Sequence, residues 1–456
     1  MVQQNTTTKL EVNKVKIEFT DKEITAYGGY SLLAKFFDKI ALRKELDNII
    51  GVKESSPNAT GIYAKIIGFI LILFAGGERF SHLLYLGSKE SLAKLFKIKR
   101  LPQASTTLTR LFNKILSTEK VACALWEYTS KLLPWQALQK DWLSFDSTVI
   151  ERYGAQEGAK KGYNPKKHGR PSHHPLIAFL NKNKYVINFK NRDGNVSCSY
   201  NVCDFFKETL ERIQDKICIE GILGDSGFYD EAFIEMLENA DKTYIIAARL
   251  YWPLQRKIYS LKDWQPVDDG IDIAEFTFTH QAWSKERRYI AVRQNIEQRK
   301  QAMGKQMKLF ENECKQYRYS VWIASSKEAA YDVWLRCRQR ANDENTIKEL
   351  KEDFALGGFC LQKFAPTEAA MLVRVFTYNL FTLFRTVVMQ QKEKIERLKT
   401  LRYKYFVIPA QFGRRGRHYV LRISTPWQGI KQKFAQLFAN INQWVINNHG
   451  NCNAFG

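Results

Sequence analysis

The sequence predicts an α/β protein, and three changes of residue pattern along its 456 residues support this prediction. Between residues 31 and 130, apolar residues recur three and four positions apart, which is the period of a helix. From Gln139, apolar and polar residues alternate and β-branched and aromatic residues become frequent, which is typical of strands. Two later stretches, residues 327–354 and 372–391, return to the helical period. We therefore expect helices first, a strand-rich centre, and helices again.

The N-terminal region, residues 1–135, is expected to be helical and contains a candidate DNA-binding motif. The stretch SLAKLFKIKRLPQASTTLTRLFNKIL (91–116) predicts two helices separated by a turn at Pro102, with Ser105 or Thr106 capping the second helix. Its basic residues are Lys94, Lys97, Lys99, Arg100 and Arg110. One interpretation is a helix-turn-helix whose second helix enters a DNA groove. The other is an ordinary pair of basic surface helices.

The centre of the chain, residues 136–249, is expected to form three strands, a helix, a strand, a helix and a strand. In chain order these are DWLSFDSTVI (141–150), PLIAFLN, KYVINFKN, CDFFKETLERIQDK (203–216), CIEGILGD, YDEAFIEMLENA and TYIIAAR (243–249). The second and third strands are predicted to form a hairpin through Lys182 and Asn183. This order matches a ribonuclease-H-like core, with a β-rich insertion at 250–325 before its last helices at 326–395.

Two aspartates lie on strands that such a core places side by side. Asp146 is midway along the first strand, and Asp225 ends the fourth strand in ILGDSGF (222–228). Strands are depleted in Asp, so an Asp among strong β-formers needs a reason. Two carboxylates on adjacent strands can share a divalent metal ion. The alternative is an edge-strand Asp that faces water and an Asp that favours an ordinary turn.

A third acid is expected from the helix predicted at 327–354, and Glu344 is the candidate. Arg340 lies four residues before it and Lys351 seven after it, so all three share one face of a helix. A carboxylate between two cations could hold metal while the cations hold phosphate. The other interpretation is a solvated helix with ordinary charge pairs. Spare charges on the same helix keep that interpretation open: Arg336, Arg338, Glu349 and Glu352.

The charge balance favours a polyanionic partner, and nucleic acid is the usual one. The chain has 70 Lys and Arg against 47 Asp and Glu, a net charge of +23. The C-terminal region, residues 396–456, is the most basic, because Asp and Glu are absent from Arg397 to Gly456. Aromatic residues are interleaved with its basic residues, which suits contacts with phosphates and with sugars or bases.

A second basic segment, KKGYNPKKHGRP (160–171), follows the first strand and is expected to be a loop that contacts DNA. Its basic residues are Lys160, Lys161, Lys166, Lys167 and Arg170. The alternative is a flexible basic surface loop. His168, His173 and His174 lie in or beside this segment, but Mg²⁺ disfavours imidazole and we do not expect a zinc site.

The cysteines and the apolar runs indicate a protein of a reducing compartment. None of the eight cysteines forms a CxxC pair, so reduced, packed thiols are expected. The N-terminus is polar and unlike a secretory signal. The most apolar run, IIGFILILFAGG (66–77), is too short to span a bilayer and predicts a core helix.

Three blocks of the sequence resemble a known family. DSTVIERYGAQEGAKKGYNPKKHGRPSHHPLIAF resembles the signature around the first catalytic Asp of bacterial insertion-sequence transposases of the IS1380 kind, within the IS4-like DDE group. GDSGFY resembles the segment with the second Asp, and RQRANDENTIKELKEDF the segment with the Glu. Tyr378-Asn379-Leu380 and FVIPAQFGRRGRHYVLRIS also look familial, and the resemblance spans roughly residues 90 to 425. One departure concerns the group's Tyr three residues before Arg340, because Cys337 occupies that position.

The resemblance implies cut-and-paste DNA transposition with Mg²⁺, or Mn²⁺ as a substitute, held by Asp146, Asp225 and Glu344. It implies that Arg340 and Lys351 hold phosphate and that the basic hairpin contacts DNA through Arg414, Arg415 and Arg417. The implied partners are double-stranded DNA, as terminal repeats and target, and a second copy of the chain. Relatives hold a flipped base with an aromatic residue of the insertion. The candidates here are Trp252, Trp264, Trp283, Tyr319 and Trp322, and the alternative is that they are core residues.

Two rival functions stay open at this point. A structure-specific nuclease on the same core would need the same three acids but would cut without joining. A protein that only binds terminal repeats and represses would need none of them. The presence of all three acids argues against the second rival.

Overall fold

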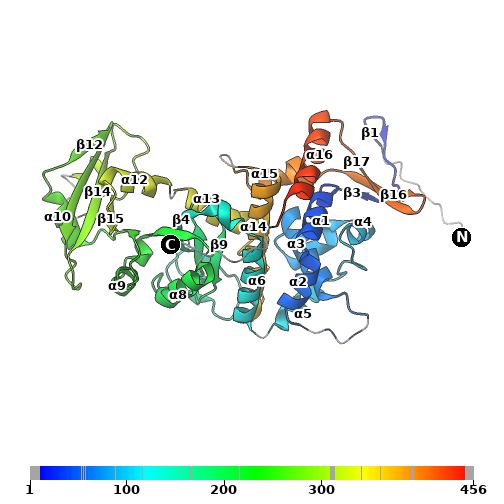
Figure 1. Ribbon diagram of the computed structural model, residues 1–456, viewed down its shortest axis with the longest axis horizontal. Helices are drawn as coiled ribbons and strands as arrows, with labels where there is room; N and C mark the ends of the chain where they lie inside the picture. Colours follow the sequence, from blue (N-terminus) through cyan, green and yellow to red (C-terminus); the bar gives the residue numbers. More distant parts are fainter. Residues whose placement is uncertain are drawn as a thin grey trace, which may run out of the picture.

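The computed structural model describes residues 11–52, 54, 56, 58–87, 89–115, 117–164, 167–214, 216–308, 314–339, 341–359, 361–391 and 395–446. Its long axis runs from a β-rich end, through a mixed centre, to a largely helical end (Figure 1). In this part of the chain, nine strands form one continuous sheet. Across the sheet they are β12 (Gln265–Asp268), β13 (Ile271–Phe278), β14 (Arg287–Asn295), β15 (Tyr317–Ala324), β11 (Tyr244–Ala247), β10 (Cys218–Gly224), β4 (Lys140–Ser147), β8 (Leu176–Leu180) and β9 (Val186–Lys190). The predicted mixed α/β class is confirmed.

The strands from β11 to β9 form the core half of the sheet. β10 is parallel to both of its neighbours, β11 and β4. β8 is antiparallel to both β4 and β9. The helices α8 (Val202–Ile213) and α9 (Glu231–Asn239) connect β9 to β10 and β10 to β11. The first and fourth strands of the predicted order are therefore adjacent, as expected.

β8 and β9 form the predicted hairpin, and Asp141 holds its turn. The Asp141 carboxylate accepts hydrogen bonds from the backbone N–H groups of Trp142 (2.7 Å), Lys182 (2.9 Å) and Asn183 (3.2 Å). The Asn183 side chain donates a further bond at 2.9 Å. Burial raises the pKa of Asp141, and these hydrogen bonds oppose the shift. This aspartate has a structural role that explains its place on a strand.

One face of the core half is covered by α8 and α9. Phe145 of β4 lies on this face, with its ring centre 5.9 Å from that of Phe205 on α8 and 5.9 Å from that of Phe233 on α9. Because successive side chains of a strand point to opposite faces, Ser144 and Asp146 belong to the other face. That other face carries the late helices.

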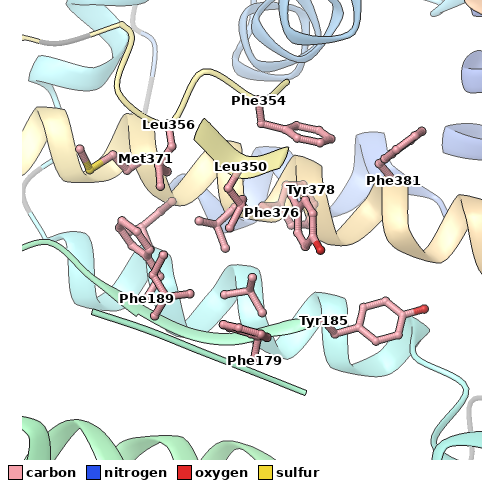
Figure 2. Packing of buried hydrophobic residues seen from close by; sticks show 14 of the residues in the cluster. Phe179, Tyr185, Phe189, Leu350, Phe354, Leu356, Met371, Phe376, Tyr378 and Phe381 are labelled. Carbon is pink, nitrogen blue, oxygen red and sulfur yellow. The ribbon is translucent and has the colours of Figure 1, made fainter. Parts of the chain in front are cut away.

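The helix α14 (Phe364–Leu383) packs against the other face of the sheet. Figure 2 shows its Met371 and Phe376 near Phe179 and Phe189 of the hairpin. With its continuation to Val388, α14 is long and apolar enough to cross a membrane by length and composition, but 89% of its most apolar window is buried within the fold. It is therefore a core helix.

The insertion extends the core sheet. β15 pairs with β11 in antiparallel fashion, with Ile323 opposite Ile246. β14, β13 and β12 then add outward, each antiparallel to its neighbour, and the helix α10 (Trp252–Tyr259) precedes them. The sequence indicates strands in this region but not their continuity with the core.

The helix predicted at 327–354 corresponds to α12 (Ala330–Gln339) and α13 (Ala341–Glu352). Arg340, between them, lies outside the described residues. The described residues on both sides of Arg340 are helical, as predicted.

The N-terminal helices α1 (Tyr30–Lys39), α2 (Leu42–Ile49) and α3 (Ile62–Ala75) form the helical end of the molecule (Figure 1). α3 contains most of the apolar run and is buried along nearly its whole length. It ends at Gly76, whose φ of +86° is the left-handed conformation that glycine adopts at helix ends. The predicted core helix is confirmed.

The candidate DNA-binding motif forms two helices, α4 (Lys89–Leu95) and α5 (Ser105–Asn113). The predicted cap of the second helix is wrong, because Ser105 is already helical and Ala104 precedes it without a side-chain hydrogen bond. α5 buries Leu108, Leu111 and Phe112. DNA reading by this motif stays a prediction.

The C-terminal region packs onto the N-terminal helices. The strands β16 (Ala410–Arg415) and β17 (His418–Ile423) form a hairpin, and β16 also pairs with β3 (Ile24–Thr25). In α16 (Gln428–Gln443), the Asn440 side chain donates a hydrogen bond to the Val388 carbonyl (2.7 Å). The two ends of the chain thus build one structural unit, which the sequence pattern does not indicate.

Candidate active site

Asp146 and Asp225, here called the acid pair, leave adjacent strands at the same level of the sheet. Phe145 of β4 is opposite Gly224 of β10, and the acid pair consists of the next residue of each strand. Asp225 keeps an extended backbone (φ −80°, ψ 179°). Neighbouring strands lie about 4.8 Å apart, so the two carboxylates emerge side by side. Both residues are partly exposed.

The turn after Asp225 orients its carboxylate and explains the glycine that follows. Asp225 Oδ1 accepts a hydrogen bond from the Gly227 N–H (2.7 Å) and so caps the short 3₁₀ turn Ser226–Phe228. A Cβ atom at Gly227 would lie 2.6 Å from both Cβ and Sγ of Cys198, which is too close for any other residue. Arg249 donates to two backbone carbonyl oxygens of this turn, at 2.8 and 3.3 Å.

Cys198 lies beside the acid pair, and sequence reasoning missed it. Its sulfur accepts a hydrogen bond from Ser147 Oγ (3.0 Å). Burial raises the pKa of the Cys198 thiol, Ser147 opposes the shift, and the carboxylates of Asp225 and Asp146 raise the pKa further. Both carboxylates therefore lie within electrostatic range of one sulfur atom. A lone cysteine roughly 50 residues from Asp146 in sequence offers no signal of this contact.

His174 relates the acid pair to α13. Burial lowers the pKa of His174, and the contact of its Nδ1 with the Val196 carbonyl (3.1 Å) opposes that shift. Among the nearby charges, Arg192 and Lys351 lower the pKa and Asp225 raises it. Lys351, on the last turn of α13, and Asp225 consequently both lie near this imidazole. Lys351 and Asp225 thus both act electrostatically on His174.

Glu344 lies on the exposed side of α13, seven residues before Lys351. Seven residues correspond to about 10.5 Å along a helix. Among the described residues, Glu344 has no hydrogen bond or ion pair, and no group of three or more His, Cys, Asp and Glu side chains is arranged to hold a metal ion. In the described residues, the Glu344 carboxylate is therefore not clustered with other His, Cys, Asp or Glu side chains.

The acidic residues at and just after the C-terminal end of α13 form ion pairs that hold the fold. Glu349 is buried and pairs with Arg385 at 2.9 Å. Asp353 pairs with Arg397 at 2.6 Å, and Glu352 with the same guanidinium at 2.9 Å. The charges of this segment are thus largely ion-paired. Glu344 stands apart from them.

The basic segment 160–171 begins and ends in short strands, whereas its residues 162–164 and 167–170 are irregular or form a turn. β6 (Lys160–Lys161) and β5 (Ile150–Glu151) both pair with β7 (Pro171–His173). The expected loop is therefore confirmed for the described middle of the segment and wrong only at its two ends. The register of β7 allows these pairings because its backbone lies between the two other strands.

The cations of this segment differ in their surroundings. Lys160 pairs with Asp193 at 2.6 Å, and Lys167 pairs with Glu151 at 2.9 Å. Lys161 is exposed, whereas Lys166 lies outside the described residues. Arg170 stacks on Tyr153, with its guanidinium carbon 4.7 Å from the ring centre. Tyr153 is 72% exposed and was missed by sequence reasoning, because a single Tyr in a motif does not indicate stacking.

The histidines next to this segment have structural contacts. His173 is fully buried, accepts a hydrogen bond from Arg152 Nε at Nδ1 (3.1 Å), and contacts the Glu157 carbonyl through Nε2 (2.9 Å). Burial and the charge of Arg152 lower the pKa of His173 to about 4. Its imidazole is therefore neutral near neutral pH. His168, in contrast, is exposed.

The aromatic candidates of the insertion are mostly packed. Tyr319 is 4% exposed, Trp283 lies 4.7 Å from the Tyr229 ring centre, and Trp264 carries the Arg293 guanidinium at 4.4 Å. Trp322 packs against an apolar cluster. Trp252, at 62%, is the exposed one of the five. The interpretation as core residues therefore fits the other four aromatic candidates better than a role in holding a flipped base.

The predicted DNA-contacting residues Arg414, Arg415 and Arg417 are exposed on the β16–β17 hairpin. Figure 1 places this hairpin at the helical end of the molecule and β4 near the centre. The structure does not bring these arginines to the acid pair.

Comparison with known proteins identifies the class of this chain. Residues 7–446 match the model of a family described as Transposase DDE domain group 1. This class is that of the DDE transposases, enzymes of DNA transposition that generally use divalent metal ions. Because the match covers almost the whole sequence, the chain belongs to this family. The predicted transposase class is confirmed.

Other comparisons add little to the family match. No curated protein matches the chain. Among solved structures, the chain is similar to piggyBac transposase, in a cryo-EM structure of its synaptic complex with hairpin DNA. That similarity has a TM-score of 0.44 and 13% sequence identity, and it covers 85% of this chain and 82% of the other.

Proposed function

We propose that this transposase moves an insertion sequence of the IS1380 kind, in the IS4-like group, by cutting its DNA ends and joining them to target DNA. The single observation that carries the proposal is the register of β4 and β10, which sets Asp146 beside Asp225. Two carboxylates at adjacent strand ends offer the oxygen ligands that Mg²⁺ prefers. The family match supports the same reaction class.

The core half of the sheet is, in this proposal, a ribonuclease-H-like core. Its strand order β9-β8-β4-β10-β11 supports this, as do the antiparallel pairs on one side of β4 and the parallel pairs on the other. Strands β12 to β15 are then an insertion, and α12 to α14 the late helices. The regions before Gln139 and after Glu396 serve DNA binding.

The donor set fits a divalent metal ion. Mg²⁺ or Mn²⁺ bound at the acid pair would supply Lewis acidity that activates water and offsets charge on the scissile phosphate. Glu344 is the proposed third carboxylate, because it is exposed on α13 and has no partner among the described residues, whereas Glu349 and Glu352 are ion-paired. Lys351 of α13 would hold a phosphate oxygen, and we assign the same role to Arg340.

In the proposed reaction, water attacks a phosphorus atom at the element end, and the 3′-oxygen of the element leaves as a hydroxyl. That hydroxyl then attacks a phosphorus atom of the target and displaces the target 3′-oxygen. The acid pair would hold the divalent metal ion that offsets the charge of the reacting phosphate in both steps, and Lys351 of α13 would hold a phosphate oxygen. Joining two ends requires two active sites, so we infer a dimer on DNA.

The place of action follows from the same proposal. The substrate is chromosomal DNA, so we infer the bacterial cytoplasm and its nucleoid. The described cysteines are free thiols, which supports a reducing compartment.

The test uses the full-length protein with duplex DNA that carries the element's ends. With Mg²⁺ we expect nicked ends and then joined products, and with EDTA neither. We expect Asp146→Asn, Asp225→Asn and Glu344→Gln to bind ends but form no nicked product. Asp204→Asn, which changes an exposed acid on α8 across the sheet, is the matched control and keeps both steps.

The outcomes separate the rival functions. Nicking without joined products would mean a structure-specific nuclease. End binding without nicking, with either metal ion, would mean a repressor and would overturn the proposal. An acid variant that still cuts would remove that residue from the site.

A further inference from the structure

We propose that α4 and the β16–β17 hairpin form one surface for duplex DNA, separate from the acid pair and here called the hairpin–α4 surface. The proposal rests on the proposed function only for the identity of the ligand, since DNA is the polyanion this protein acts on. The two basic segments are more than 300 residues apart in sequence. The structure places them in direct contact.

Tyr419 joins the two segments. The Lys94 ammonium of α4 lies 5.0 Å from its ring centre, and the Arg414 guanidinium carbon lies 4.7 Å from it. Arg414 also donates a hydrogen bond to the Tyr419 hydroxyl (2.7 Å). The Phe412 ring stacks beneath at 5.4 Å, with an angle of 10° between the planes. One aromatic side chain therefore positions cations from both ends of the chain.

The hairpin is firmly attached to the N-terminal helices. β16 pairs with β3, with Ala410 opposite Thr25. The Phe412 N–H donates to the Glu23 carbonyl at 2.9 Å. The Glu23 carboxylate accepts a hydrogen bond from the Ser91 N–H at the start of α4 (2.7 Å). Strand pairing and the Glu23 side chain thus connect the hairpin to α4.

The tip of the hairpin presents further cations to solvent. Gly416, with φ of +59°, permits the two-residue turn between the strands. Arg415 and Arg417 flank it, Arg422 follows on β17, and all three are exposed. From Arg397 onward the chain contains no carboxylate side chain. An array of arginines with little local neutralisation, beside an exposed tyrosine, suits phosphates and the sugars between them.

The position of this surface gives it a distinct role. In Figure 1 the hairpin lies at one end of the long axis, the insertion lies at the other, and β4 lies between them. A duplex with its end at the acid pair would therefore meet the hairpin–α4 surface at base pairs further inside the element. We infer that this surface holds internal DNA and supplies affinity, whereas the acid pair supplies chemistry.

The test measures binding without catalysis. Fluorescence anisotropy in EDTA would follow binding of a long duplex of arbitrary sequence to the wild type and to Arg414→Ala/Arg417→Ala, across a range of salt concentrations. Each lost phosphate contact lowers the slope of log affinity against log salt by about 0.9. We expect the double variant to lower the slope by about 1.8. The control Lys131→Ala/Lys207→Ala removes the same charge from exposed sites on the helices α6 (Thr118–Leu132) and α8.

Tyrosine variants test the shared surface directly. Tyr419→Ala should weaken binding, because Lys94 and Arg414 lose the ring that positions them. Tyr419→Phe should bind nearly as the wild type, since it keeps the ring. An unchanged thermal midpoint shows that each variant is folded. An Ala variant that is folded and binds like the wild type would overturn the role of Tyr419.

Hydroxyl-radical footprints on the element's end decide whether this is one surface. We expect Lys94→Ala and Arg414→Ala to lose protection at the same internal nucleotides. Protection lost at two separate stretches, or an unchanged salt slope in the double variant, would overturn the proposal. So would equal competition by polyglutamate, which would indicate an acidic protein partner. Asp225→Asn should keep the whole footprint, so failure of the cleavage proposal would be seen separately.

Discussion

The acid pair and Glu344 are held by two different kinds of structure. Asp146 and Asp225 lie on adjacent strands whose backbone hydrogen bonds set their register, so their separation follows from the sheet itself. Glu344 lies on α13, whose position depends on side-chain packing and ion pairs at its end. The first two acids are therefore positioned by the backbone of the core, whereas the third depends on how one helix docks.

The docking of α13 rests on its C-terminal turn. Figure 2 shows Leu350 and Phe354 beside Tyr378 of α14, and both Leu350 and Phe354 are fully buried. Glu349, next to Leu350, forms the buried ion pair with Arg385. One face of α13 is thus anchored in the core while Glu344 stays exposed. Variants of the two glutamates should separate anchoring from chemistry.

The largest expected effect is that of Glu349→Ala on stability. It leaves Arg385 buried without its carboxylate and removes the acceptor of the Leu398 N–H. Breaking a buried ion pair in this way costs about 3–5 kcal/mol of unfolding free energy, measured by denaturant unfolding. Glu344→Ala, on the same helix but exposed, should change stability by less than about 0.5 kcal/mol and still abolish cleavage. Equal destabilisation by both would show that Glu344 has a structural role.

The next effect concerns the turn that holds Asp225. In Gly227→Ala the new Cβ would press on the Cβ and Sγ atoms of Cys198 at 2.6 Å. Overpacking of this kind costs about 1–3 kcal/mol, and the displaced turn should lower cleavage more than DNA binding. Gly429→Ala on α16 is the matched control, because no atom lies within 4 Å of its added Cβ. Normal cleavage by Gly227→Ala would show that the turn does not orient Asp225.

The acid pair and its neighbours also show what can be predicted from the sequence. The strand order and the adjacency of Asp146 and Asp225 follow from local patterns, because alternation and turns set the strands and topology sets their neighbours. The neighbours of the acid pair cannot be predicted from local patterns. Cys198 and His174 lie on irregular backbone, which leaves no periodic signal in the sequence. Likewise, contacts such as Lys94 with Tyr419 arise only after the C-terminal region packs onto the N-terminal helices.

A smaller effect is the pH dependence of stability that the buried His173 causes. Burial and Arg152 lower the pKa of His173 from its ordinary 6.5 to about 4 in the folded protein. The unfolded chain therefore takes up a proton at a higher pH than the folded chain does. The contribution of neutral His173 to the unfolding free energy is complete above pH 6.5 and is lost as the pH falls toward 4. His173→Gln should flatten the decline of unfolding free energy over that range. His168→Gln, at an exposed site, should leave the decline unchanged.

The smallest effect is expected at the basic segment 160–171. Lys160 pairs with Asp193 at 2.6 Å, but the two side chains are 54% and 34% exposed. Such pairs contribute about 0–1 kcal/mol because water and salt screen them, so Lys160→Ala should barely change the thermal midpoint. If the segment contacts DNA, the same variant should lower the salt slope of binding by about 0.9. Lys161→Ala, an exposed neighbour on the same strand, should lower the slope equally. A change in stability without a change in slope would mean that Lys160 only secures Asp193, and that the cations of the segment do not track the DNA backbone.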